Sequence, residues 1–190
     1  MIFTPKVCLA IRFSIKTHEL DQKQKRKNKD AAYITHPLTV GLILAKAGAN
    51  EDTIIAGILH DTIEDSVPEK KVTQEIIKDM FGENVAVLVQ SVTEDAELSW
   101  EENKAGMLSR VKEYSHDSLL VKSADLISNG TELMDDYREF SDEIFANFER
   151  PKDIQNNHYI HMVEAVIARW PESPLAEDLR SVKEEMAKLF

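Results

Sequence analysis

Apolar residues recur at spacings of three and four along most of the chain, which is the period of an amphipathic helix. Between Pro37 and Gly48, for example, Leu38, Leu42 and Ala45 fall on one face. Proline suits a first helical position and glycine suits a helix end, so this segment carries both boundary signals of a helix. The same period continues along the sequence and predicts an all-α fold.

Three valines, Val85, Val87 and Val89, alternate as they would in a β-strand. Helix formers flank them and no second strand is available for pairing, so we expect a helix here as well. No repeat, low-complexity tract or Gly/Ser linker divides the sequence, which predicts one domain over residues 1–190. We expect a bundle of roughly eight or more helices. The predicted helices cover residues 37–47, a segment capped by Asn50 and running through Leu59, and residues 69–80, 83–92, 100–114, 118–134, 141–148, 154–168 and 174–189.

Composition narrows the class of protein. The formal net charge of −11 argues against a general nucleic-acid binder, because such proteins need a basic face. The single cysteine, Cys8, points to a reducing compartment, so we expect a cytoplasmic protein. The apolar run from Val7 to Ile11 ends at Arg12 and is too short to span a membrane, so no membrane partner is expected. Oligomeric state is not predicted.

Five basic residues nevertheless gather in one short segment: Lys23, Lys25, Arg26, Lys27 and Lys29. A local positive field of this kind suits a small molecule that carries phosphates, even on an acidic protein. The alternative is a solvated basic loop.

The sequence contains two His-Asp pairs, at residues 60–61 and 116–117. The second pair lies between two helical patterns, where Asp117 or Ser118 would cap the next helix. We therefore interpret it as structural. His158 and His161 are interpreted as surface or structural histidines, because no third ligand lies near them in the sequence. Trp100 is interpreted as core or helix-end packing.

The pair at 60–61 differs, because it follows the apolar segment 54–59 and precedes Glu64 and Asp65. Carboxylates at a helix C-terminus repel one another and the helix dipole, and a bound cation would relieve both effects. If the helix continues, His60 and Glu64 share one face and Asp61 and Asp65 another. His60 and Asp61 could then ligate a metal while Glu64 and Asp65 reach a water beside it. The alternative is a solvated acidic helix end with His60 in the core.

Two further residues qualify as ligands. His36 precedes Pro37, which fixes its position at an expected helix start. Asp125 lies in an otherwise apolar helix, on a polar stripe with Lys122 and Asn129. A buried carboxylate needs a partner, and the alternative partner is Lys122 in an internal ion pair.

Taken together, these segments resemble the hydrolase domain of RelA/SpoT-type proteins, and more closely the small alarmone hydrolases that consist of that domain alone. The resemblance covers roughly residues 5 to 130, and more weakly the tail from Ile154. The matching stretches are residues 10–13 through His18, 24–27, Tyr33 to Leu38, Ile58 to Asp65, Val92 to Asp95, and Val121 to Asp125 with Asn129.

The resemblance implies an HD-domain helical bundle that forms a single metal-dependent phosphohydrolase domain. It implies four metal ligands, and these are His36, His60, Asp61 and Asp125. The family uses Mn²⁺, which implies one such ion per chain, although the ligand chemistry equally admits Fe, Co or Zn. Glu64 and Asp65 would position and deprotonate the attacking water.

The implied substrate is a guanosine tetra- or pentaphosphate whose 3′-pyrophosphate is hydrolysed, giving GDP or GTP and pyrophosphate. The resemblance places Arg26 and Lys27, with Lys25, against the nucleotide, and an arginine plane can stack on a purine. Lys122 and Asn129 would face phosphates and ribose, and Tyr159 would lie near the sugar or the 5′-phosphate.

Three departures from the family lie on the nucleotide side. About three extra residues, close to one helical turn, separate His18 from Gln24. Leu126 stands where the family has arginine, and the region after Asn129 is longer and acidic. Three alternatives therefore stay open: an adenosine-alarmone hydrolase, another HD-superfamily nucleotide phosphohydrolase, and a catalytically silent domain that binds the alarmone.

Overall fold

The computed structural model describes residues 3–27, 29–95 and 97–190, and helices dominate these ranges. They contain no β-strand, only an isolated bridge between Lys25 and Ala32. The prediction of an all-α fold is therefore confirmed. The α-helices are α1 (Pro5–Ile15), α2 (Thr35–Lys46), α3 (Glu51–Leu59), α4 (Thr62–Asp65), α5 (Gln74–Phe81), α6 (Glu83–Val92), α7 (Trp100–Arg110), α8 (His116–Phe140), α9 (Lys152–Arg169) and α10 (Ala176–Leu189). A π-helical segment η1 (Lys16–Asp21) and three 3₁₀ segments, η2 (Pro68–Lys70), η3 (Val111–Glu113) and η4 (Ser141–Asn147), complete them.

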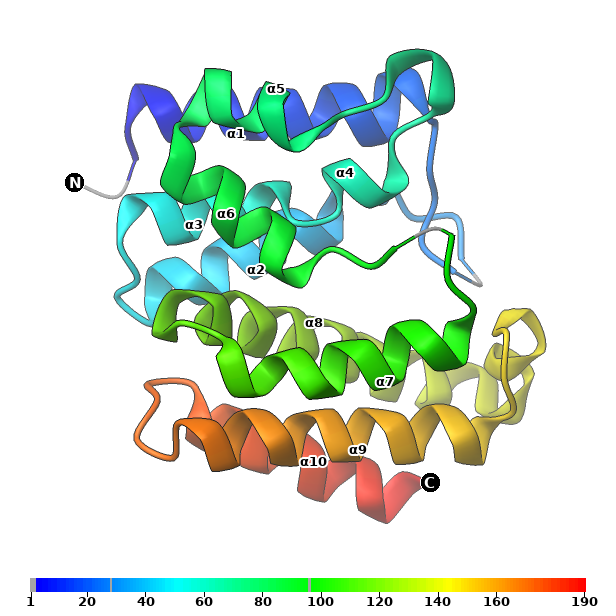
Figure 1. Ribbon diagram of the computed structural model, residues 1–190. Coiled ribbons are helices and arrows are strands. Elements are labelled where there is room, and N and C mark those ends of the chain that lie inside the picture. The colour runs from blue at the N-terminus through cyan, green and yellow to red at the C-terminus, as the bar shows by residue number, and fades with distance from the viewer. Residues whose placement is uncertain (1–2, 28, 96) are drawn as a thin grey trace.

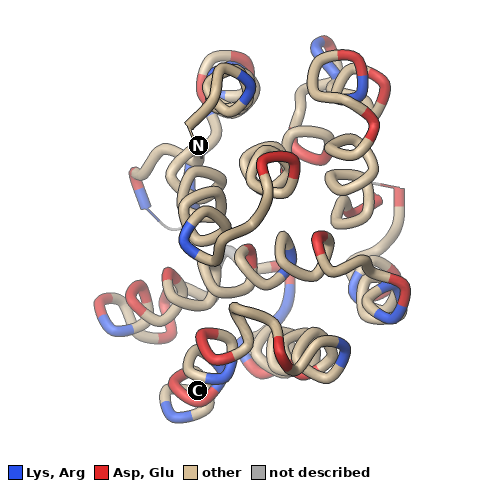
Figure 2. The backbone as a smooth tube through the Cα atoms, turned by 90° about the vertical axis from the view of Figure 1, so that its left-hand side faces the viewer, with Lys and Arg blue, Asp and Glu red and all other residues tan. Residues whose placement is uncertain are grey.

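The helices are stacked around two central elements, α3 and α8. Helix α3 packs against α1, α2, α6 and α8, and α8 packs in turn against α9 and α10 (Figure 1). Acidic and basic positions are interspersed along the chain rather than separated into two faces (Figure 2). Within the described ranges, no helix has the length and apolar character that crossing a lipid bilayer demands.

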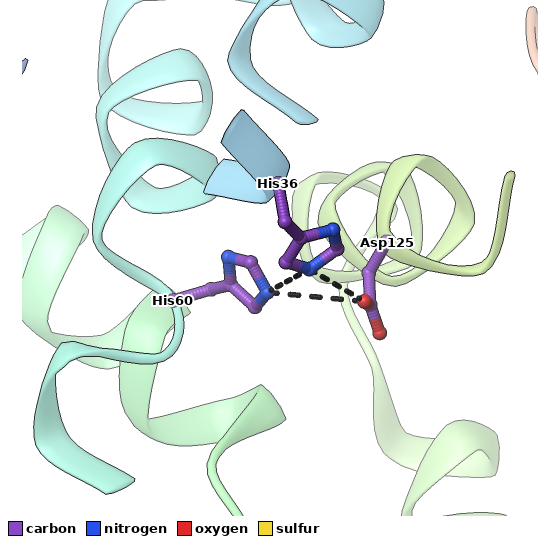
Figure 3. Close-up of side chains that lie close together, drawn as sticks. All are labelled: His36, His60 and Asp125. Atoms are coloured by element: carbon purple, nitrogen blue, oxygen red, sulfur yellow. Dashed lines mark hydrogen bonds and ion pairs between the residues drawn. The ribbon is translucent and has the colours of Figure 1, made fainter. Parts of the chain in front are cut away.

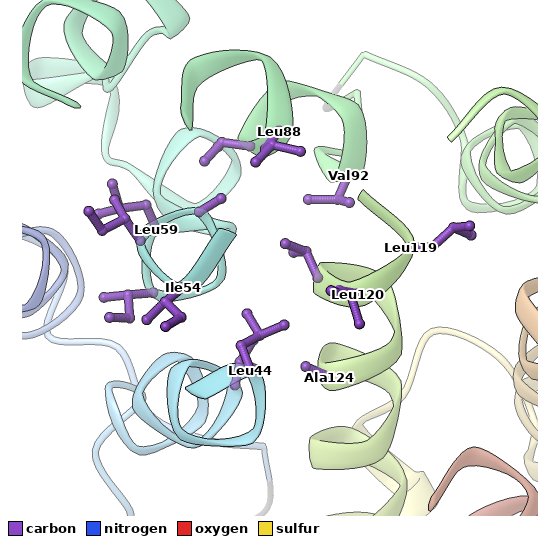
Figure 4. Close-up of a cluster of buried hydrophobic side chains, with 14 of the residues drawn as sticks. Leu44, Ile54, Leu59, Leu88, Val92, Leu119, Leu120 and Ala124 are labelled. Atoms are coloured by element: carbon purple, nitrogen blue, oxygen red, sulfur yellow. The ribbon is translucent and has the colours of Figure 1, made fainter. Parts of the chain in front are cut away.

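Helix α3 is apolar almost all round, and every residue from Thr53 to Leu59 is buried. A helix without a polar face has to lie inside the fold, which explains its central position. Ile54 and Leu59 of α3 belong to the main hydrophobic core together with Leu44 of α2 and Leu120 of α8 (Figure 4). The end of α3 therefore delivers His60 into the interior.

Close packing of α2 on α3 depends on glycine. A Cβ atom on Gly57 would overlap Leu44 and approach Val40 Cγ1 to 3.1 Å, and one on Gly41 would lie 2.7 Å from Ile58 Cγ1. The absence of side chains lets the two helices approach, which brings the start of α2 close to the end of α3.

We expect Gly57→Ala to lower the free energy of unfolding. Overpacking a filled core costs about 1–3 kcal/mol, which exceeds the gain of up to about 1 kcal/mol from replacing a helical glycine by alanine. Gly106→Ala in α7 is the matched control, since a Cβ there meets nothing within 4 Å. Urea unfolding should show a lower midpoint for Gly57→Ala only; equal or higher stability of both variants would contradict the packing argument.

Two predicted helices are wrong in part. The segment expected as one helix over 69–80 is a 3₁₀ turn followed by α5, because Thr73 is extended and its side chain caps α5. The segment 141–148 is the 3₁₀ helix η4 rather than an α-helix, because Ser141 has a φ of 53° and breaks the path of α8.

Other boundaries also differ from prediction. Helix α8 begins at His116, and its N-cap is Ser115, whose Oγ accepts from the Ser118 backbone N–H at 3.0 Å. The expectation that Asp117 or Ser118 caps this helix is therefore wrong. Helix α7 ends at Arg110, before η3, and α1 was not among the predicted helices.

Candidate metal centre and its cavity

Two buried histidines face each other between α2 and α3. His36 lies in the first turn of α2 and His60 caps the end of α3, and their Nε2 atoms are 3.2 Å apart. On the far side of each ring, His36 Nδ1 lies 3.0 Å from Ser128 Oγ, and His60 Nδ1 donates to the Gly57 carbonyl at 2.8 Å. Such outer contacts orient a ring so that its other nitrogen can serve as a ligand.

Asp125 joins the pair from α8. Its Oδ1 lies 3.3 Å from His36 Nε2 and 3.8 Å from His60 Nε2 (Figure 3). One ligand atom from each of these three residues lies within 4.8 Å of the others. Lys122 donates to Asp125 Oδ2 at 2.8 Å and Asn129 donates to Oδ1 at 2.6 Å. The internal ion pair with Lys122 therefore coexists with the approach of Asp125 to the histidines.

Asp61 approaches the same point. Its Oδ1 lies 3.0 Å from His60 Nε2 and its Oδ2 lies 3.7 Å from His36 Nε2. Tyr33 donates its hydroxyl to Oδ2 at 2.6 Å. The condition that the helix continues beyond His60 is not met, because α3 ends at Leu59 and the short α4 begins after Asp61, which occupies its N-cap position.

The donor set fits a divalent metal ion. Two imidazole nitrogens and the Asp125 carboxylate converge, with Asp61 Oδ1 beside His60, and such a mixed nitrogen and oxygen set suits Mn, Fe, Co or Zn. The local field is negative: burial opposes a charged His60, yet Asp61 and Asp125 raise its pKa to about 9. Lys122 and the histidines hold the pKa of Asp125 well below its usual range despite burial. A site that attracts a proton this strongly also attracts a cation.

Glu64 and Asp65 lie beside this centre but point to different partners. Glu64 Oε2 accepts from the Glu94 backbone N–H at 3.0 Å, whereas Asp65 Oδ2 accepts from Gln24 Nε2 at 2.9 Å. Burial, with Asp61 next, raises the pKa of Glu64 to about 7 and also raises that of Asp65. Glu64 can therefore exchange a proton near neutral pH.

A cavity of about 480 Å³ opens in front of these residues. Every residue predicted as a ligand, an acid-base group or a substrate contact contributes to its wall. Carboxylates outnumber cationic side chains in this lining. An anionic ligand in this cavity therefore needs a metal ion or the basic segment to offset them.

The basic segment is held against α8. Arg26 Nη2 donates to Glu132 Oε2 at 2.6 Å and to Asn129 Oδ1 at 2.9 Å, and its guanidinium carbon lies 5.2 Å from the centre of the Tyr33 ring. Lys29 bridges Glu132 at 2.6 Å and Asp136 at 2.8 Å. The acidic region after Asn129, noted in the sequence, thus neutralises part of the basic segment.

The other side chains predicted to contact the nucleotide differ in whether protein groups already bind them. Lys25 pairs with the exposed Asp30 at 2.9 Å, whereas Lys27 Nζ lies 5.0 Å from the centre of the Phe148 ring and has no ion pair among the described residues. Tyr159 donates its hydroxyl to the Leu126 carbonyl at 2.8 Å, and Gly130 makes room for it. Of the predicted contacts Lys25, Arg26 and Lys27, Lys27 is therefore the one for which a ligand phosphate competes with no described carboxylate.

Part of the cavity wall was not predicted. Trp100 lines the cavity with its ring 5.6 Å from that of His158, and Lys104 lies 6.0 Å from its centroid. Burial, and then Lys104, lower the pKa of His158 to about 4. The interpretation of Trp100 as packing and His158 as structural is thus incomplete, because only the chain path from α7 to α9 brings them to the cavity.

The second His-Asp pair does not line the cavity. His116 stacks on Trp170 with ring centroids 4.0 Å apart, and Asp117 accepts from Asn50 Nδ2 at 3.2 Å. Both residues hold the ends of helices together.

A family model described as an HD domain matches residues 10–148 of the chain. Among the curated relatives, the guanosine-3′,5′-bis(diphosphate) 3′-pyrophosphohydrolase MESH1 of Danio rerio is 34% identical over 126 residues, 65% of this chain and 66% of the relative. The enzyme of the same activity from Aquifex aeolicus is 46% identical over 83 residues, but these are 44% of this chain and only 11% of that protein. The chain thus corresponds to part of a much longer protein in the second case.

Two solved structures are similar in fold. One, described as a metazoan ortholog of SpoT that hydrolyzes ppGpp, has a TM-score of 0.78 at 21% identity and covers 97% of both chains. The other, lmo0812 from Listeria monocytogenes, has a TM-score of 0.71 at 28% identity and covers 87% of this chain and 99% of that one. With His36, His60 and Asp125 gathered at one point and the family match spanning most of its length, the chain belongs to the HD-domain family.

Proposed function

We propose that this protein is a metal-dependent 3′-pyrophosphohydrolase of guanosine 3′,5′-bis(diphosphate) and its pentaphosphate analogue, releasing pyrophosphate and GDP or GTP. The observation that carries the proposal is the convergence of His36, His60 and Asp125, with ligand atoms within 4.8 Å of one another, on the wall of a cavity of about 480 Å³. Relatives that bear this activity in their names, from bacteria and animals, support the substrate class.

His36, His60, Asp61 and Asp125 would hold the ion, which we propose to be Mn²⁺. When bound, a divalent cation polarises a phosphoryl oxygen and lowers the pKa of a water molecule. Lys122 and Asn129 hydrogen-bond to Asp125, and Tyr33 to Asp61, so these residues orient the two carboxylates. The outer contacts restrict the carboxylates to one geometry.

Glu64 would accept the proton of the attacking water. Its pKa near 7 lets it be ionised in much of the population at neutral pH and still take up a proton. Asp65, fixed by Gln24, would orient the water from the other side. The two acids thus divide proton transfer and positioning.

Phosphates and base would lie along the basic segment. Lys27, which has no ion pair among the described residues, would meet a phosphate, and the face of Arg26 would meet the base. Lys25, Asn129 and Tyr159 complete this side of the cavity.

Product analysis tests the proposal directly. Purified protein, with and without added Mn²⁺, is incubated with guanosine and adenosine tetra- and pentaphosphates, and the products are separated by chromatography. Release of pyrophosphate from the guanosine compounds is the expected result. Release from the adenosine compounds alone would reassign the base, release of orthophosphate would indicate another phosphohydrolase, and binding without turnover would indicate a silent domain.

Charge at the basic segment gives a second prediction. Glu132→Gln should lower the KM for the tetraphosphate about two- to fivefold at low salt. In the wild-type protein, the Glu132 carboxylate competes with substrate phosphates for Arg26 and Lys29, and a partly exposed ion pair of this kind is worth up to about 1 kcal/mol. The effect should shrink as salt rises. Asp135→Asn, an exposed acid of the same helix paired with Arg138, is the control. A raised KM would instead show that Glu132 holds Arg26 in its binding position.

A further inference from the structure

A fully buried histidine, His18, lies close to the candidate acid Asp65 and has no role in the hydrolysis proposed for this protein. It belongs to the π-helical segment η1. π-Helical turns are rare and are often found at functional sites.

His18 is connected to Asp65 through Gln24. His18 Nδ1 lies 2.8 Å from Gln24 Oε1, and Gln24 Nε2 donates to Asp65 Oδ2 at 2.9 Å. Gln24 is also held by its backbone, since its N–H donates to the His18 carbonyl at 2.8 Å and its carbonyl accepts from Tyr33 at 3.2 Å. The glutamine side chain therefore forms a bridge whose two ends are both occupied.

The direction of these hydrogen bonds follows from their chemistry. The Gln24 oxygen is an acceptor, so His18 must carry its hydrogen on Nδ1. The other ring nitrogen, Nε2, is buried without a partner among the described residues, and a hydrogen there would be a buried unsatisfied donor. If the amide were reversed, its oxygen would face a carboxylate oxygen of Asp65. The tautomer of His18 thus decides which end of Gln24 faces the acid.

We propose that His18 is a positioning residue, which fixes the amide of Gln24 so that its N–H holds Asp65 in the orientation used in hydrolysis. This inference rests on the proposed function, because that function assigns Asp65 its task. The ring of His18 also lies 4.9 Å from that of Tyr33, whose hydroxyl donates to Asp61. One buried ring thereby supports the residues that contact both Asp65 and Asp61.

Three variants test the relay. His18→Leu removes the donor, and we expect kcat to fall about 10- to 100-fold, the usual cost of losing an outer hydrogen-bond partner, with KM unchanged. His18→Asn restores kcat, because an asparagine amide places an N–H close to the position of Nδ1. Ser14→Ala, at another buried polar atom without a described partner one turn earlier, is the control and keeps wild-type kcat.

A second measurement is independent of turnover. Long-range ¹H–¹⁵N correlation spectra of the full chain should show the His18 hydrogen on Nδ1 and an unprotonated Nε2. A hydrogen on Nε2 overturns the proposal, as does an equal loss of kcat in His18→Leu and Ser14→Ala that tracks thermal stability and is not restored by His18→Asn. If the wild-type protein releases no pyrophosphate, the proposed function fails, and with it the task given to His18, whereas the spectrum alone still decides the hydrogen-bond direction.

Discussion

Asp125→Asn should abolish both metal binding and hydrolysis. The substitution keeps the volume of the side chain but removes the charge that faces His36 Nε2 at 3.3 Å and His60 Nε2 at 3.8 Å. We expect a loss of about 10³-fold or more in kcat/KM, because a divalent cation supplies several kcal/mol of transition-state stabilisation and each 1.36 kcal/mol is a factor of ten. Metal content after dialysis, measured by mass spectrometry, should fall in parallel.

The control for this prediction is again Asp135→Asn, which alters an exposed acid on the same helix. Asp125→Asn also leaves Lys122 without its buried carboxylate partner, so its thermal stability must be recorded before activity is compared. A folded Asp125→Asn protein that retains metal and activity would show that the buried cluster is a structural ion-pair network.

Glu64→Gln should retain the metal and lose the rate. A positioned general base contributes about 10²- to 10⁴-fold, and glutamine cannot accept the proton. In the wild-type protein, kcat/KM should rise with pH through about 7, because burial and Asp61 raise the pKa of Glu64 to about 7 and only its ionised form is a base. The variant should lack this rise.

The same carboxyl group makes a prediction for stability. Its pKa is raised from 4.5 to about 7 on folding, so the folded protein binds more protons than the unfolded chain between these values. The contribution of Glu64 to the free energy of unfolding therefore falls as pH rises through this window. Glu64→Gln should remove that decline in urea unfolding measured between pH 5 and 8.

Wild-type turnover by the variant, or an unchanged pH-rate profile, would exclude Glu64 as the base.

Local patterns were sufficient for the class of fold. The spacing of apolar residues predicted the helix at 83–92 with its observed limits, against the strand-like alternation of its valines. Boundaries failed where a single backbone angle decided them, as at Ser141, whose φ of 53° no periodicity reveals. The cap of α8 was misplaced because Ser115, Asp117 and Ser118 are all suitable capping residues.

For the cavity, too, the sequence indicated some residues and left others unrecognised. The sequence and its family resemblance named the residues of one wall, since their chemistry is unusual in apolar segments. They did not indicate that Arg26 and Lys29 would be paired with Glu132 and Asp136, which lie about a hundred residues away along the chain. Nor did they place Trp100 and Lys104 on the wall of the same cavity as the candidate metal ligands.

The sequence by itself determined that the fold is helical and that the segment 54–59 is apolar enough to be buried, and together with its family resemblance it named the side chains that are candidates for metal-binding and acid-base chemistry. These properties depend on residue type and spacing within one or two helical turns. Only the tertiary structure decided the partners: Gln24 on Asp65, Tyr33 on Asp61 and Glu132 on Arg26. A hydrogen bond or ion pair is set by the distance between two atoms, and that distance arises from the packing of helices remote in sequence.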